Sequence, residues 1–247
     1  MKDKKLSLSS DLKRIGLVAS AAFLRHESDQ CDSYMLSEVL KSCMDETEFP
    51  EETSDVFNAY FARLKEPYYY SANTAEIAAA LAEKATFRFL DLIFFGPTLE
   101  DYRRRQVFNE RYCPLSNVNV TTLLNWCQLG NFQERLGMIS EAIYPFEEEP
   151  ESDGVVLSEQ AHVIINATQD PSTVLRNFST FVQPHAYAGS AVIIIAKRRQ
   201  AFEVLLKHDR PDIRNATATQ ISKIKELEES TRRYEQADYK QSEQRFE

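Results

Sequence analysis

Glycine is the residue whose scarcity most limits what this chain can fold into, because only six glycines occur among 247 residues. Turns with positive φ and phosphate-binding loops depend on glycine, whereas helices need very few of them. Hydrophobic residues make up 43% of the chain, which is enough to build a core. The sequence therefore predicts a mainly α-helical fold.

The first 65 residues show apolar positions at helical spacing. In the first segment, residues 10–25, these positions form one stripe, made of Leu12, Ile15, Ala19, Ala22 and Phe23, with Val18 at its edge. Ser9 or Ser10 can cap this helix. We expect a second helix to follow Asp32 or Ser33, and Ser54 to cap a third.

An extended segment, YYYS, comes after Pro67, which stops the third helix. The order of helix, helix, helix and extended segment resembles a winged-helix layout. In a DNA reader of this kind, the third helix enters the major groove with its first residues. Here the acidic loop DETEFPEETSD precedes that helix, and phosphate would repel it. The resemblance therefore implies a winged-helix-like start that holds protein rather than DNA.

Further helices are expected up to about residue 145. Asn73 with Glu76 forms a capping-box pattern before a long apolar helix, which ends at Gly96-Pro97. An arginine-rich helix follows it. Asn131 opens another helix, and Pro145 ends it.

The segment PFEEEPESDG, residues 145–154, is the best candidate for a boundary, because it is acidic, contains proline and has no periodicity. We expect four parts: a helical domain over 1–145, an acidic linker over 146–154, a smaller C-terminal α or α+β unit over 155–210, and a charged tail helix over 211–247.

The C-terminal unit has two interpretations. HVIINAT (162–168) and AVIII (191–195) are rich in β-branched residues, so they could be strands on either side of a helix. They could equally belong to three successive helices. We favour helices, because KRRQAFEVLLKH continues past AVIII without a turn residue. After Thr217 the chain is charged and lacks a sustained heptad, which predicts one solvated helix.

Charge and cysteine usage narrow the class of protein. The net charge of −9 argues against a general binder of polyanions. The four cysteines have neither CxxC spacing nor a histidine at zinc-ligand distance, so we interpret them as buried thiols in a reducing compartment. No signal peptide and no apolar run of about 18 residues is present, so we expect a cytoplasmic protein without a membrane segment.

Motifs for catalysis or cofactor binding are missing from the sequence. The four histidines are far apart and form neither HxxxH nor HExxH. GxSxG, GxxxxGK[ST] and GxGxxG do not occur. We therefore expect no catalytic residue, no metal site and no cofactor.

The stretch EDYRRRQVFNER (100–111) is the first candidate contact surface. Consecutive helical residues point about 100° apart, so its three consecutive arginines cannot form one grip. Acidic residues four positions before Arg104 and Arg105 indicate a salt-bridged polar face instead. Arg104 and Arg111 remain candidates for docking a partner, together with Tyr68, Tyr69 and Tyr70, although edge tyrosines more often cover a core.

The most basic stretch, AKRRQAFEVLLKHDR, is the second candidate surface. Its candidate contact residues are Lys197, Arg198, Arg199, Lys207 and Arg210. Glu203 is four residues from both Arg199 and Lys207 and cannot neutralise both fully. If a surface of this protein meets nucleic acid, we expect it here; the competing interpretation is an ordinary solvated face.

From these features we expect a non-catalytic protein–protein interaction subunit or adaptor. Its landing surface would be the aromatic-rich segments 56–61 and 86–95, and its partners other protein subunits. One alternative is a nucleic-acid-associated regulatory subunit that uses residues 197–210. Another is a small α/β enzyme with its site in residues 155–210.

Overall fold

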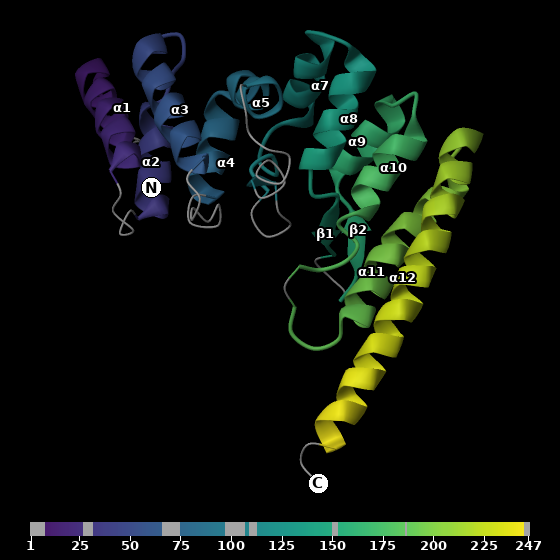
Figure 1. Ribbon diagram of the computed structural model, residues 1–247. Coiled ribbons are helices and arrows are strands. Elements are labelled where there is room, and N and C mark those ends of the chain that lie inside the picture. Colours follow the sequence, from purple (N-terminus) through teal and green to yellow (C-terminus); the bar gives the residue numbers. More distant parts are fainter. Residues whose placement is uncertain are drawn as a thin grey trace, which may run out of the picture. The chain divides into compact units, whose positions relative to one another are not determined.

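In the computed structural model the chain divides into two compact units, residues 1–126 and 127–247. The structure describes residues 8–26, 32–65, 75–96, 107–108, 113–149, 153–185 and 187–244. Within these ranges helices dominate, and the only strands form one two-stranded sheet (Figure 1). The predicted mainly α fold is confirmed.

Unit 1 is built from helices. They are α1 (Ser10–Arg25), α2 (Ser33–Cys43), α3 (Pro50–Leu64), α4 (Ala75–Lys84), α5 (Thr86–Phe95) and α7 (Val120–Gln128), whose last residues belong to unit 2. The first helix packs against α2 and α3, and α2 packs against α4 (Figure 1). The extended segment that completes the winged-helix resemblance lies outside the described residues.

Local signals set most of the helix starts. The Ser9 hydroxyl caps α1 and the Asp32 carboxylate caps α2, as predicted. The third helix begins at Pro50 and not at Ser54, because proline at the first helical position already fixes φ. The Ser54 hydroxyl instead donates to the Pro50 carbonyl inside the helix.

The long apolar helix predicted before Gly96 is two helices, α4 and α5. The break falls at Ala85, whose φ of −144° and ψ of 57° are not helical. Both halves are apolar, so periodicity alone could not locate the break. The aromatic half, α5, buries Phe89, Leu90 and Ile93 in the core of unit 1.

The apolar stripe predicted on α1 faces solvent. The helix buries the opposite side, made of Leu17, Ser20, Ala21 and Leu24. Leu17 is 0% exposed, whereas Ile15 on the stripe is 62% exposed. The first helix therefore attaches to unit 1 through Leu17 and Leu24, with the small residues Ser20 and Ala21 between them.

Unit 2 contains two strands and the remaining helices. They are α8 (Phe132–Ala142), β1 (Phe146–Glu148), β2 (Val155–Leu157), α9 (Glu159–Ala167), α10 (Pro171–Ser179), α11 (Ala191–Glu203), the 3₁₀ helix η2 (Val204–Lys207) and α12 (Pro211–Gln244). The strands pair antiparallel, with Phe146 opposite Leu157. We expected residues 146–154 to form a linker, but the first three of them form strand β1.

The two β-branched segments of the C-terminal half are helical. HVIINAT lies in α9 and AVIII begins α11, so the favoured interpretation is correct and the strand–helix–strand alternative is wrong. Ser158 and Asp170 cap α9 and α10 through their side chains. These caps start helices that a β-branched composition alone would not predict.

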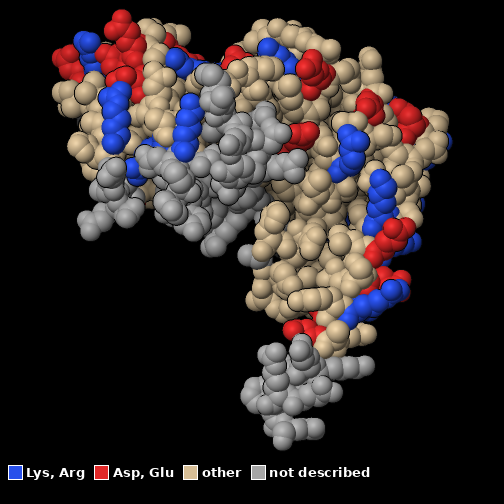
Figure 2. Space-filling view, in the orientation of Figure 1, with Lys and Arg blue, Asp and Glu red and all other residues tan. Residues whose placement is uncertain are grey.

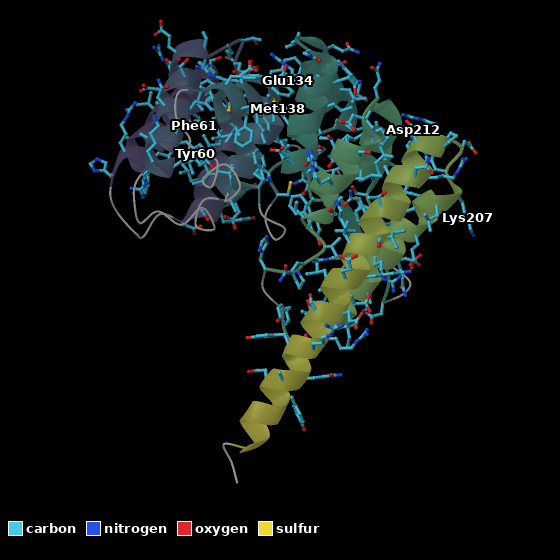
Figure 3. The ribbon with its side chains drawn as sticks, turned by 45° about the vertical axis from the view of Figure 1, so that its right-hand side comes forward. Tyr60, Phe61, Glu134, Met138, Lys207 and Asp212 are labelled. Carbon is cyan, nitrogen blue, oxygen red and sulfur yellow. The ribbon has the colours of Figure 1, made fainter. Side chains whose placement is uncertain are left out.

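The last helix, α12, runs along α11, although its apolar positions thin out after Leu227 (Figures 1 and 3). In that part of α12, polar contacts hold the helix against α11. The Arg199 guanidinium bonds Glu228 at 3.0 Å. The Glu235 carboxylate accepts from the Ser190 hydroxyl and the Ala191 amide, both at 2.7 Å. A carboxylate from α12 therefore caps the N-terminus of α11.

The orientation of α1 predicts that truncating Leu17 and truncating Ile15 change the free energy of unfolding by very different amounts. Leu17→Ala should lower the free energy of unfolding by about 2–5 kcal/mol, because it leaves a cavity in the core. Ile15→Ala should change it by no more than about 0.5 kcal/mol, because Ile15 is exposed. Urea unfolding of both variants measures the difference. Equal losses would show that the stripe is buried.

Candidate protein-docking surface

The outward side of α1 is a continuous apolar surface, called here the α1 face. It consists of Leu8, Leu12, Ile15, Val18, Ala19, Ala22 and Phe23. Four of its large side chains, Leu12, Ile15, Val18 and Phe23, are between 53% and 62% exposed. Leu8, just before the helix, is 40% exposed.

Close packing of α1 on α2 fixes the direction in which this face points. A Cβ at Gly16 would lie 2.6 Å from the Cys43 Sγ and 3.4 Å from the Val39 Cγ1. A larger residue there requires the Cys43 side chain or one of the two helices to move. The close contact favours the orientation in which Gly16 faces α2 and the apolar stripe faces outward.

Ion pairs to α3 and to Glu48, just before it, hold α1 along its other edge. The Lys13 ammonium lies 3.0 Å from Glu48, the Arg14 guanidinium 2.5 Å from Glu52, and the Arg25 guanidinium 2.7 Å from Asp55. Figure 2 shows acidic and basic side chains side by side over this part of unit 1. Such surface pairs contribute little stability individually, but together they favour one orientation.

One residue of α2, Met35, extends the apolar surface beyond α1. It is 59% exposed. Met35 lies one turn before Val39, on the side of α2 that approaches α1. Among the described residues, seven of the sixteen exposed large hydrophobic side chains fall between Leu8 and Met35. Contiguous apolar surface of this kind is typical of protein-binding sites.

The aromatic-rich segments expected to receive partners are mainly core. Phe57, Tyr60 and Phe89 are at most 1% exposed. Tyr60 meets Phe61 edge to face, with ring centroids 5.5 Å apart (Figure 3). At the end of α5, Phe95 is 51% exposed and stacks on Trp126. The candidate docking surface is therefore the α1 face, which is aliphatic apart from Phe23.

Most candidate cations of the basic stretch are engaged within unit 2. Lys197 lies 2.5 Å from Asp153, Arg199 bonds Glu203 and Glu228, and Arg210 lies 2.6 Å from Asp212. The fifth candidate, Lys207, is exposed and points away from α12 (Figure 3). These ion pairs reduce the positive charge available to a phosphate backbone.

Arg198 is a buried structural residue. It is 9% exposed, and it donates to the backbone carbonyls of Phe181 at 2.8 Å and Val182 at 3.4 Å. Its guanidinium lies over the rings of Tyr144 and Phe146, at 5.7 and 5.6 Å from the centroids. Arg198 thus ties α11 to the loop after α10 and to β1.

The remaining candidates, Tyr68, Tyr69, Tyr70, Arg104 and Arg111, lie outside the described residues. The part of the chain that the structure describes contains no group of three or more His, Cys, Asp or Glu that could hold a metal ion. A hollow of about 510 Å³ is lined by side chains of α11 and α12, including Val192 and Glu235. Its carboxylate, Glu235, is the one that caps α11.

The cysteines of the described region are buried, as predicted. Cys43 and Cys113 are 5% and 8% exposed, and Cys127 is 0% exposed. Burial raises the pKa of Cys127 to about 11 and also raises the pKa of Cys43. Both thiols are therefore protonated near neutral pH and are weak nucleophiles. Cys31 lies outside the described residues.

Arg198 and Lys207 should respond differently to truncation. Arg198→Ala should destabilise the protein by about 2–3 kcal/mol, because two carbonyls lose a charged donor and two rings lose a cation. Lys207→Ala should change stability by less than about 0.5 kcal/mol. Thermal and urea unfolding compare the variants. A neutral Arg198→Ala would contradict the structural role.

The buried thiols make a second prediction. With iodoacetamide at pH 7.5, Cys127 and Cys43 should remain unmodified in the folded protein and react fully after unfolding in urea, because only exposed thiolate is alkylated. Peptide mass spectrometry identifies the modified positions. Rapid modification of Cys127 in the folded state would contradict its burial.

The comparisons with known proteins give no relative. No family model matches the chain, and no curated protein or solved structure matches it. None of the described helices is long and apolar enough to cross a membrane.

Proposed function

We propose that this chain is a non-catalytic protein–protein interaction subunit, an adaptor of a multi-protein complex in the cytoplasm. The observation that carries the proposal is the exposed α1 face. We infer that this face, with Met35, is where a partner protein docks.

The energetics favour a covered α1 face. Burying one large apolar side chain stabilises a contact by roughly 1.5–3 kcal/mol. Leu12, Ile15 and Phe23 are each more than half exposed, so together they offer the kind of cluster that dominates protein interfaces. A helix held by close packing and ion pairs also loses little conformational freedom on binding.

Native affinity purification of the tagged chain from its own cells tests this function. The wild-type chain should carry a partner in stoichiometric amounts, and Ile15→Glu should reduce that partner at least about tenfold, since a charge in an apolar interface is costly. Val204→Glu is the matched control, because Val204 is 64% exposed but lies on η2 in unit 2.

Two outcomes of the purification would overturn the proposal. One is a wild-type tagged chain that carries neither an untagged copy of itself nor another protein in stoichiometric amounts. The other is an Ile15→Glu variant that retains its partner as well as Val204→Glu does. Far-UV circular dichroism must show equal helix content for all three proteins, so that a loss of binding cannot be attributed to a loss of folding.

A further inference from the structure

The α1 face carries opposite charges at its two ends, on one edge. Asp11 and Arg25 are fourteen residues apart, which is almost four helical turns, so they lie on the same side of α1. Val18, which is 55% exposed, lies on that side midway between them. Asp11 is exposed, and the Arg25 side chain is 50% exposed. This edge therefore has a carboxylate at its start and a guanidinium at its end, with Arg14, which pairs with Glu52, one turn after Asp11.

This arrangement is complementary to itself. We propose that the partner covering the α1 face is a second copy of this chain, with the two α1 helices antiparallel about a twofold axis near Val18. The proposal rests on the proposed function and names its partner. In such a pair, Asp11 of each copy lies beside Arg25 of the other, which gives two symmetric ion pairs.

Charge also selects the direction of the pair. In a parallel arrangement about a twofold axis, the charged edges of the two copies lie on opposite sides of the contact, so Asp11 and Arg25 gain no partner across it. The antiparallel arrangement places both charged edges on the same side and gives two attractions. Arg25 already pairs with Asp55, but a guanidinium has five N–H donors and can serve two carboxylates.

The apolar side chains suit the same register. With the twofold axis near Val18, Ile15 of one copy comes level with Ala22 of the other, and Leu12 comes level with Phe23 towards the ends of the contact. A large side chain opposite a small one lets two helices approach closely. Ala19, beside the axis, leaves room at the centre.

The size of the contact sets the expected affinity. A helix of sixteen residues is about 24 Å long, so one face buries less than the roughly 800 Å² per partner of a standard interface. We expect a dissociation constant in the micromolar range. Met35, beside the α1 face, would add apolar area at its edge.

Sedimentation equilibrium of the purified full chain, from ~1 to ~500 µM, tests the dimer over the micromolar range. The wild-type chain and Val204→Glu should both dimerise, and Ile15→Glu should remain monomeric. A wild-type chain that is monomeric throughout overturns the proposal. So does a dimer that Ile15→Glu leaves intact.

Charge exchange tests the antiparallel register separately. Asp11→Arg and Arg25→Asp should each weaken the dimer about tenfold, because each places like charges together twice. The double variant should have a dimer dissociation constant within about threefold of the wild-type value, since the opposite charges meet again. Failure of the double variant to recover, with unfolding midpoints unchanged, overturns the antiparallel pairing.

The experiments also distinguish a second copy from other molecules that could cover the α1 face. The purified chain could be a monomer and yet bind a different protein in cells, and Ile15→Glu could abolish that binding. This result overturns the proposed dimer but leaves the proposed function standing. A monomer that floats with phosphatidylcholine–phosphatidylserine vesicles, and no longer does so with Ile15→Glu, assigns the face to lipid and overturns both.

Discussion

The close approach of α1 to α2 at Gly16 decides what unit 1 presents to solvent. With the Cys43 sulfur and the Val39 side chain this near, Gly16 faces α2 and α1 buries Leu17, Ser20, Ala21 and Leu24, while Leu12, Ile15, Val18 and Phe23 face outward. The exposed set has more apolar area than the buried set, so the observed choice reflects packing geometry more than the amount of apolar surface. The ion pairs to α3 and to Glu48 before it then favour that orientation.

Unit 2 relies on polar contacts where the apolar pattern of the last helix runs out. Arg199 joins Glu203 on its own helix and Glu228 on α12, while Glu235 replaces a local cap at the start of α11. Arg198, on the same helix, is buried against two carbonyls and two aromatic rings. A stretch that has high positive charge in sequence thus serves mainly as internal scaffolding. Its cations have close partners, and this lowers their value as a nucleic-acid surface.

The sequence predicts the helix content and most of the helix caps, and it favours helices for residues 162–168 and 191–195. These features are predictable because capping side chains and 3.6-residue periodicity are local properties. The Ala85 break was not, since both flanking segments are uniformly apolar. The stripe on α1 was predictable as a stripe, but its direction depends on Gly16 meeting Cys43, a contact between helices. Likewise, the partners of Lys197 and Arg199 include Asp153 and Glu228, whose positions no local pattern reveals.

The Glu235 carboxylate also bears on how unit 2 is made. Helix α11 begins at Ala191, yet the acceptor for its first amide lies 44 residues later in the chain. During synthesis these amides have no such acceptor until residue 235 has left the ribosome. Native packing of α11 is therefore a late event in translation, and a chain stalled between the two helices would expose an incomplete unit to chaperones.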